Sequence, residues 1–194
     1  MSNQLYKEMT NLRGQDLYPD NELENYLVEA IFPKDSNELA IKLSNVTSAF
    51  YGLTLKHVGL QCGWDKVDSV SKSLFKELGQ LKTREALENN IKIEKDTRGL
   101  AQVLISAIFT SSPKYKFSFK KYTPQETIVN IIGTCRYYDI AKKIDIEKNL
   151  TWPTLIPFFE GIAEELGIKC DIDIQINKLE ENYCHYVAVF KAQT

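Results

Sequence analysis

Apolar residues recur along this chain with two different periods, and the change between them falls at Pro113. Before Pro113 they are spaced three and four residues apart, which is typical of amphipathic helices. After it, Tyr115, Phe117 and Phe119 alternate with polar residues, as in a half-buried strand. Helices followed by strands, instead of alternating with them, predict an α+β fold.

Four helices are predicted in the first half of the chain. Asp20 and either Asp35 or Ser36 are suitable N-caps for the first two, and Cys62 with Gly63 ends the second. The predicted ranges are Asp20–Ile31, Asp35–Cys62, Asp65–Glu88 and Thr97–Phe109. The second helix has the strongest apolar stripe, made of Leu39, Leu43, Val46, Phe50, Leu53, Thr54, His57 and Val58.

The second half is expected to form two strand pairs with helices between them. The predicted strands are 115–120, 127–134, 168–177 and 183–190, with a short helix over 137–144 and another that ends at Gly167. We therefore expect one domain over 1–194, an N-terminal helical bundle packed on a C-terminal antiparallel sheet of about four strands with one or two helices. Residues 1–19 would be a loosely ordered lead-in, 20–112 the helical part and 113–194 the sheet-containing part.

Composition narrows the range of partners. The net charge is -2, so the chain has no excess of Lys and Arg to neutralise the phosphates of nucleic acid or an anionic membrane surface. No stretch approaches the roughly 20 apolar residues of a membrane helix, and the polar N-terminus has no apolar signal core. The sequence predicts a cytoplasmic protein that binds neither nucleic acid nor membrane. Its four cysteines match no metal or redox spacing, and we expect no metal and no cofactor.

Candidate catalytic chemistry depends on isolated residues, because the signatures of phosphate loops, dinucleotide sites, serine hydrolases and zinc proteases are absent. Cys135 follows a predicted strand and precedes a short helix, where the helix N-terminus and Arg136 favour a reactive thiolate. A buried structural cysteine is at least as common. His57 could be a base facing a pocket, although a histidine on an apolar stripe is more often a core or boundary residue.

Large side chains suggest an alternative, a small-ligand pocket between the helices and the sheet. The same aromatic residues are also what protein cores are made of. The predicted ligand-binding residues are Phe50, Trp64, Arg136, Trp152, Phe158 and Phe159.

Several short motifs between Leu39 and Phe190 resemble the L-2-amino-thiazoline-4-carboxylic acid hydrolase-like family. They are Ala49-Phe50-Tyr51-Gly52-Leu53, Cys62-Gly63-Trp64, Glu77-Leu78-Gly79-Gln80, Gly133-Thr134-Cys135-Arg136-Tyr137 and Leu179-Glu180-Glu181-Asn182-Tyr183-Cys184-His185-Tyr186. The resemblance implies a helix-plus-sheet protein that opens a thiazoline ring by hydrolysis. Cys135 and Cys184 match the first and last family cysteines, so Cys135 would be the nucleophile or oxyanion partner and His57 a candidate base.

The predicted order of elements is also similar to small-ligand sensor domains of the vinyl-reductase-like and haem-nitric-oxide-binding types. The chain lacks their proximal histidine before the first strand and their tyrosine–serine–arginine signature, which disfavours haem. Two hypotheses follow: a hydrolase of a small heterocyclic amino-acid-like or amide-like substrate that requires Cys135, or a non-catalytic small-ligand-binding domain. Action through a homodimer or another partner is a third alternative.

Overall fold

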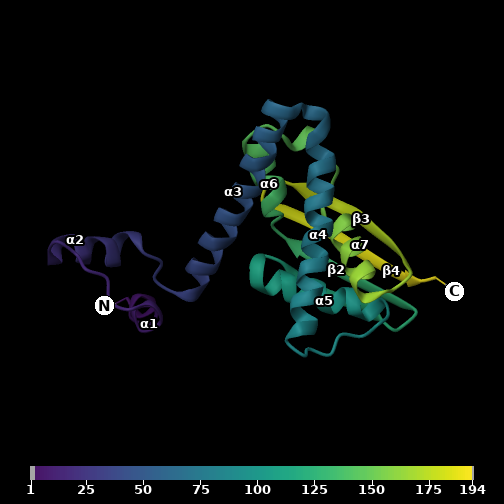
Figure 1. Cartoon of the computed structure of the whole chain (residues 1–194), viewed down its shortest axis with the longest axis horizontal. Helices are drawn as coiled ribbons and strands as arrows, with labels where there is room; N and C mark the ends of the chain where they lie inside the picture. The colour runs from purple at the N-terminus through teal and green to yellow at the C-terminus, as the bar shows by residue number, and fades with distance from the viewer. Residues whose placement is uncertain (1–2, 194) are drawn as a thin grey trace.

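Residues 3–193 are described by a computed structural model, which has the predicted α+β fold (Figure 1). Helices α1 to α5 come first, and two further helices lie between the strand pairs. The α-helices are α1 (Gln4–Arg13), α2 (Asn21–Tyr26), α3 (Ser36–Cys62), α4 (Val67–Glu88), α5 (Thr97–Ser111), α6 (Arg136–Lys143) and α7 (Leu155–Leu166). A short π-helix, η1 (Leu27–Ile31), and two 3₁₀ helices, η2 (Trp64–Lys66) and η3 (Glu147–Asn149), accompany them. The strands are β1 (Lys116–Tyr122), β2 (Glu126–Gly133), β3 (Cys170–Glu180) and β4 (Tyr183–Ala192).

The helix ends follow the capping residues in the sequence. The Asp20 carboxylate accepts from the backbone N–H of Leu23 at 2.8 Å, and the Asp35 carboxylate accepts from that of Glu38 at 2.8 Å. Gly167 closes α7 in the left-handed conformation with φ +69°, which a glycine adopts without steric cost. These predicted boundaries are confirmed.

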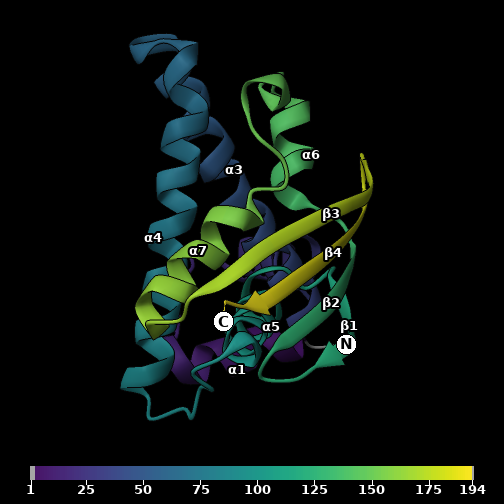
Figure 2. The ribbon, with the colours of Figure 1, turned by 90° about the vertical axis from the view of Figure 1, so that its right-hand side faces the viewer.

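The four strands form one antiparallel sheet in the order β1-β2-β4-β3. Both predicted hairpins are present, and pairing of β2 with β4 joins them. Figure 2 shows the helices gathered on one side of the sheet. The face of the sheet towards the helices therefore carries most of its buried side chains, which are Thr127, Val129, Ile131, Ile174, Cys184, Tyr186, Ala188 and Phe190. Val187 is buried on the opposite face.

Helix α7 lies between the sheet and α4. Its buried Phe159 packs against Phe190 of β4, with ring centroids 4.6 Å apart. On the opposite side, glycines let the two helix backbones approach closely: a Cβ on Gly79 would overlap the Phe158 carbonyl oxygen, and one on Gly161 would overlap the Lys76 carbonyl oxygen. Gly79, which would weaken an isolated helix, therefore permits the packing of α4 on α7.

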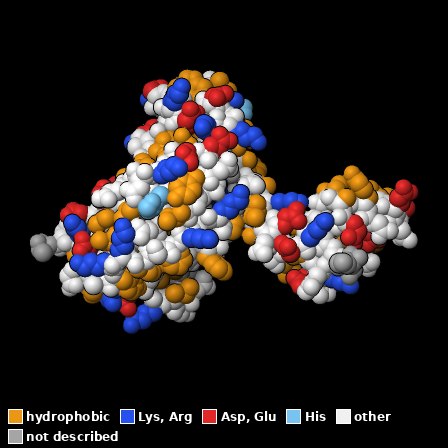
Figure 3. Space-filling view, turned by 180° about the vertical axis from the view of Figure 1, so that it is seen from behind, with side chains coloured by type: hydrophobic (Ala, Val, Ile, Leu, Met, Phe, Trp, Pro, Cys, Tyr) orange, Lys and Arg blue, Asp and Glu red, His pale blue; other side chains and the backbone are white. Residues whose placement is uncertain are grey.

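The N-terminal arm, residues 3–35, begins with α1, which lies within the lead-in expected over residues 1–19, and continues with α2 and η1 where the helix Asp20–Ile31 was predicted. Asn3 holds it together: its side-chain oxygen caps α1 at the N–H of Tyr6, and its amide donates to the carbonyls of Val28 at 2.9 Å and Pro33 at 3.1 Å. This cap and its long-range bonds were not recognised in the sequence. The arm stands away from the sheet and joins the rest of the protein through a narrow neck (Figure 3).

Helix α3 is turned differently from what its pattern suggests. Its apolar stripe is largely exposed, and the face that contacts the core is made chiefly of small residues. Neither α3 nor any other described helix is long and apolar enough to cross a membrane. The buried positions of α3 are Ser44, Ser48, Tyr51, Gly52, Leu55 and Gly59.

Candidate functional site

The three predicted catalytic residues are not arranged around an open site. Cys135 is only 3% exposed and Cys184 is fully buried, both within the hydrophobic core. His57 lies on the exposed face of α3, away from the core. Burial, reinforced by the neighbouring Cys135, raises the pKa of Cys184 to about 12. A thiol in this environment stays protonated at neutral pH and is a poor nucleophile.

Two tyrosines surround these cysteines and share their low-dielectric environment. Burial, with further contributions from Cys135 and Cys184, raises the pKa of both Tyr115 and Tyr186. The Tyr186 hydroxyl is buried without a hydrogen-bond partner among the described residues. Deprotonation of Cys184, Tyr115 or Tyr186 would be costly, so the cluster has the character of a core and not of an acid–base site.

The aromatic residues predicted to line one apolar pocket lie in different environments. Phe158 and Phe159 are buried in the core, whereas Phe50 is 68% exposed on α3. Trp64 folds back over Gly59, and Trp152 packs edge-on against Tyr138 with centroids 5.2 Å apart. The predicted apolar pocket is therefore not formed by these side chains.

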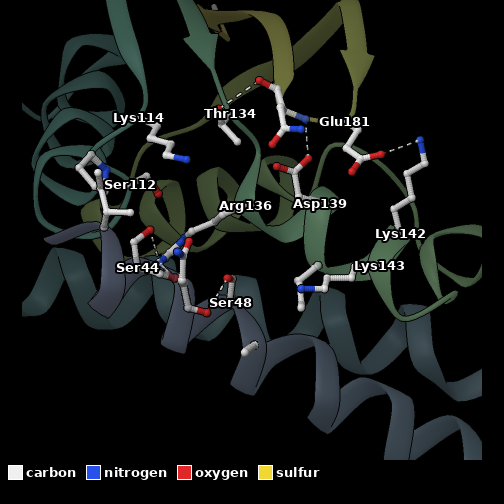
Figure 4. A pocket seen from close by; sticks show the side chains of 16 residues that line it. Ser44, Ser48, Ser112, Lys114, Thr134, Arg136, Asp139, Lys142, Lys143 and Glu181 are labelled. Carbon is white, nitrogen blue, oxygen red and sulfur yellow. Dashed lines mark hydrogen bonds and ion pairs between the residues drawn. The ribbon is translucent and has the colours of Figure 1, made fainter. Parts of the chain in front are cut away.

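A polar cavity of about 750 Å³ lies instead between α3, α6, the α5–β1 connection and the β3–β4 turn (Figure 4). Its volume is in the range of small-molecule sites. Of the predicted ligand-binding residues, Arg136 lines it. Its full lining is Ile41, Ser44, Asn45, Ser48, Ala49, Ser112, Pro113, Lys114, Thr134, Arg136, Asp139, Ile140, Lys142, Lys143, Glu181 and Asn182.

Arg136 is a buried cation in the lining of this cavity, with only 7% of the residue exposed. Its Nη1 donates to the Ser44 carbonyl at 2.8 Å and to the Thr47 hydroxyl at 2.8 Å, and its Nη2 donates to the Tyr137 hydroxyl at 2.5 Å. All of these acceptors are neutral. Its Nε has no hydrogen-bond partner, and no carboxylate lies within ion-pair distance of the guanidinium among residues 3–193.

Two acidic side chains line the same cavity, Asp139 on α6 and Glu181 in the β3–β4 turn. The Asp139 carboxylate accepts from the backbone N–H of Asn182 at 3.0 Å, and the Thr134 hydroxyl donates to the Asn182 carbonyl at 3.1 Å. Glu181 pairs with Lys142 at 3.6 Å. Burial raises the pKa of Asp139, and the nearby Glu181 adds to this shift. These contacts fix the turn over one end of the cavity.

Sequence reasoning missed most of the cavity because its residues are small or polar. Ser44 and Ser48 are four residues apart on α3, and they could have indicated a helix face that another element approaches closely. Lys114 follows Pro113 in a connection whose path the pattern does not define. The apolar stripe of α3 drew attention to the opposite side of the helix.

Neither metal-ligating side chains nor similarity to known proteins indicates which reaction, if any, takes place in the cavity. Across residues 3–193, no three His, Cys, Asp or Glu side chains are grouped so that they could hold a metal ion. No protein-family model, curated protein or solved structure matches this chain, and the thiazoline-hydrolase resemblance therefore stays a prediction.

Proposed function

We propose that this protein binds a small organic anion, carrying a carboxylate or phosphate group, in the cavity next to Arg136. The observation that carries this proposal is the buried guanidinium of Arg136, which faces a 750 Å³ cavity and has no carboxylate partner among the described residues. A buried charge is costly unless it is paired. An anionic ligand in the cavity would supply the missing negative charge beside the guanidinium.

The position of Arg136 in its helix strengthens this argument. It is the first residue of α6, where the helix dipole favours negative charge and disfavours a cation. The backbone N–H groups of a helix N-terminus also favour bound anions. An anion near Arg136 would therefore interact favourably with both the side chain and the helix end.

The other charges around the cavity are consistent with an anion. Four cationic and two anionic side chains line it, so its net charge is positive although that of the whole chain is negative. Lys114 and Lys143 have no ion pair with any described carboxylate. Figure 4 shows Lys114 extending over the space above Arg136. A ligand whose acidic group lies between them would receive hydrogen bonds from both.

The hydrolase hypothesis differs from this proposal in what it requires of Cys135. In the folded protein we expect a thiol reagent to label the exposed Cys62 first and the half-buried Cys170 next. Cys135 and Cys184 should react at least 100-fold more slowly than Cys62, because both are buried. Peptide mass spectrometry after timed alkylation gives the order. Faster labelling of Cys135 than of Cys62 would restore the thiolate mechanism and contradict binding without catalysis.

Binding is tested by thermal unfolding in the presence of a panel of small carboxylates, phosphates and their neutral amides or alcohols. We expect at least one acid to raise the Tm and its uncharged counterpart to leave it unchanged, since a ligand at 100 times its Kd stabilises by about 2.7 kcal/mol. Lys114→Gln should weaken binding of that acid about 3- to 10-fold. Lys116→Gln, two residues away on exposed β1, should have no effect.

Two results would contradict the proposal. The first is a panel in which no acid at millimolar concentration changes the Tm. The second is equal weakening by Lys114→Gln and Lys116→Gln, which would mean that the acid responds to overall charge and not to this cavity.

A further inference from the structure

The apolar stripe of α3 is a row of large side chains along one helix that the fold leaves exposed. Phe50 is 68%, Leu60 61% and Leu43 59% exposed. Single exposed apolar side chains are ordinary, but a row of them along one helix marks an interaction site. We call this row the α3 seam; it comprises Leu39, Leu43, Val46, Phe50, Leu53, His57 and Leu60.

The spacing of the α3 seam alternates strictly between four and three residues from Leu39 to Leu60. This is the heptad repeat of a coiled coil, with Leu43, Phe50 and His57 at a positions and the other seam residues at d positions. At 100° per residue the seam is centred opposite the face of α3 that contacts the core. A side chain cannot serve both faces, so from Leu43 to Leu60 the seam is left uncovered by the described residues of its own chain.

We propose that the α3 seam pairs in parallel with the α3 seam of a second copy, making the protein a homodimer. A heptad seam is self-complementary, because each a and d side chain inserts among equivalent residues of a matching helix. A two-fold axis along α3 would bring identical seams together and leave the ligand cavity on the other face of the helix.

The charges beside the seam favour the parallel arrangement. The g positions hold Lys42, Ala49 and Lys56, and in a parallel pair they face the e positions of the second copy. Those e positions are Thr47, Thr54 and Gln61, which carry no charge. The antiparallel alignment that pairs Val46 with Phe50 would instead bring Lys42 towards Lys56 of the second copy, and like charges repel.

The size of the seam is close to what a dimer requires. From Leu39 to Leu60 it is about 32 Å long, and its side chains expose on the order of 600 Å² in total, against ~800 Å² per partner in a standard interface. The N-terminal arm, which precedes α3 in the chain, carries further exposed apolar residues, namely Leu12, Leu17, Leu23, Tyr26 and Ile31. An amphipathic membrane helix would carry many basic residues beside its apolar face, whereas only Lys42 and Lys56 flank the seam.

The decisive measurement is the molar mass of the full chain in solution by light scattering and sedimentation velocity. We expect a dimer for the unaltered protein at micromolar concentration. Phe50→Asp should raise the dimer Kd more than 100-fold. Phe109→Asp, which alters a phenylalanine on α5 that is even more exposed than Phe50, should leave the dimer intact. Circular dichroism identifies any variant that fails to fold, and Leu53→Asp then provides a second test of the same surface.

The orientation of the helices is tested by crosslinking. In a Cys62→Ser, Cys170→Ser background, Val46→Cys should form an intermolecular disulfide on mild oxidation, because d positions face each other in a parallel pair. His57→Leu should tighten the dimer about tenfold, since a polar residue at an a position costs stability.

Three outcomes would overturn the proposal: an unaltered protein that stays monomeric at 100 μM, a Phe50→Asp variant that remains dimeric, or a dimer that Val46→Cys does not crosslink. Monomeric protein that sediments with vesicles of phosphatidylcholine and phosphatidylserine would assign the seam to a lipid surface instead. None of these outcomes depends on whether the cavity binds an anion.

Discussion

Replacing Gly161 by alanine is expected to destabilise the protein by about 3 kcal/mol or more, although alanine is the better helix former. An added Cβ would overlap the carbonyl oxygen of Lys76 in the adjacent turn of α4. Backbone atoms cannot move away as a flexible side chain can, so α7 would have to separate from α4. Because α7 also buries Phe159 against Phe190, that separation would open the core above the sheet.

Gly52→Ala is the matched control, because Gly52 is also a buried glycine within a long helix. The atoms nearest to its new Cβ would belong to the side chains of Ile140 and Ile144, at 3.0 and 3.1 Å, and not to backbone. These can shift by a few tenths of an ångström, so we expect a change within about 1 kcal/mol. Urea unfolding followed by circular dichroism measures both variants. Equal destabilisation by the two substitutions would show that contact with backbone is not what makes Gly161 necessary.

Local patterns predicted the helices, strands and hairpins because each is specified by residues close in sequence. The change of period at Pro113 and the caps at Asp20 and Asp35 are of this kind. Helix α1 and the contacts that hold the N-terminal arm together were missed, because those of Asn3 join residues 25 and 30 positions apart. No periodicity reports such a bond.

The orientation of the long helices was harder to predict, for a physical reason. Leucine stripes usually face a core, but α3 and α4 contact the rest of the protein through small residues such as Ser48 and Gly79. Small side chains permit a close approach that strengthens dispersion contacts between backbones. A stripe left on the other face then becomes a surface for another molecule, and hydropathy alone does not distinguish these cases.

The candidate site was also only partly predictable from the sequence. Arg136 was selected for its position beside Cys135, and it does line a cavity. The cysteine was expected to be the reactive group, yet its side chain lies in the core while Thr134 and Arg136 on either side of it face the cavity. The cavity itself is assembled from four separate segments of the chain. These segments come together only in the tertiary fold, so the cavity could not be predicted from local sequence patterns.

Arg136→Met is expected to reduce anion affinity at least 100-fold while leaving the ligand-free protein nearly as stable as before. The substitution removes the charge-assisted hydrogen bonds to the ligand. It also removes a buried cation without a carboxylate partner, and such a replacement by an apolar side chain of similar volume is often neutral. Removing the unpaired cation favours folding, whereas losing its hydrogen bonds to Ser44, Thr47 and Tyr137 opposes folding. We expect the two effects nearly to cancel.

The alternative is that Arg136 serves only to join α6 to α3, and two further variants separate these roles. Thr47 accepts a hydrogen bond from Arg136 but does not line the cavity. Thr47→Val should therefore weaken the contact between α6 and α3 and leave the anion affinity unchanged. Arg136→Lys keeps the charge but not the planar fork, and should recover only part of the binding. Calorimetric Kd values and urea unfolding without ligand are measured for each variant. If Arg136 only joins α6 to α3, Arg136→Met should lower the unfolding free energy by about 3 kcal/mol, because its buried hydrogen bonds are lost. The anion affinity should then stay unchanged, because the ligand does not contact this residue.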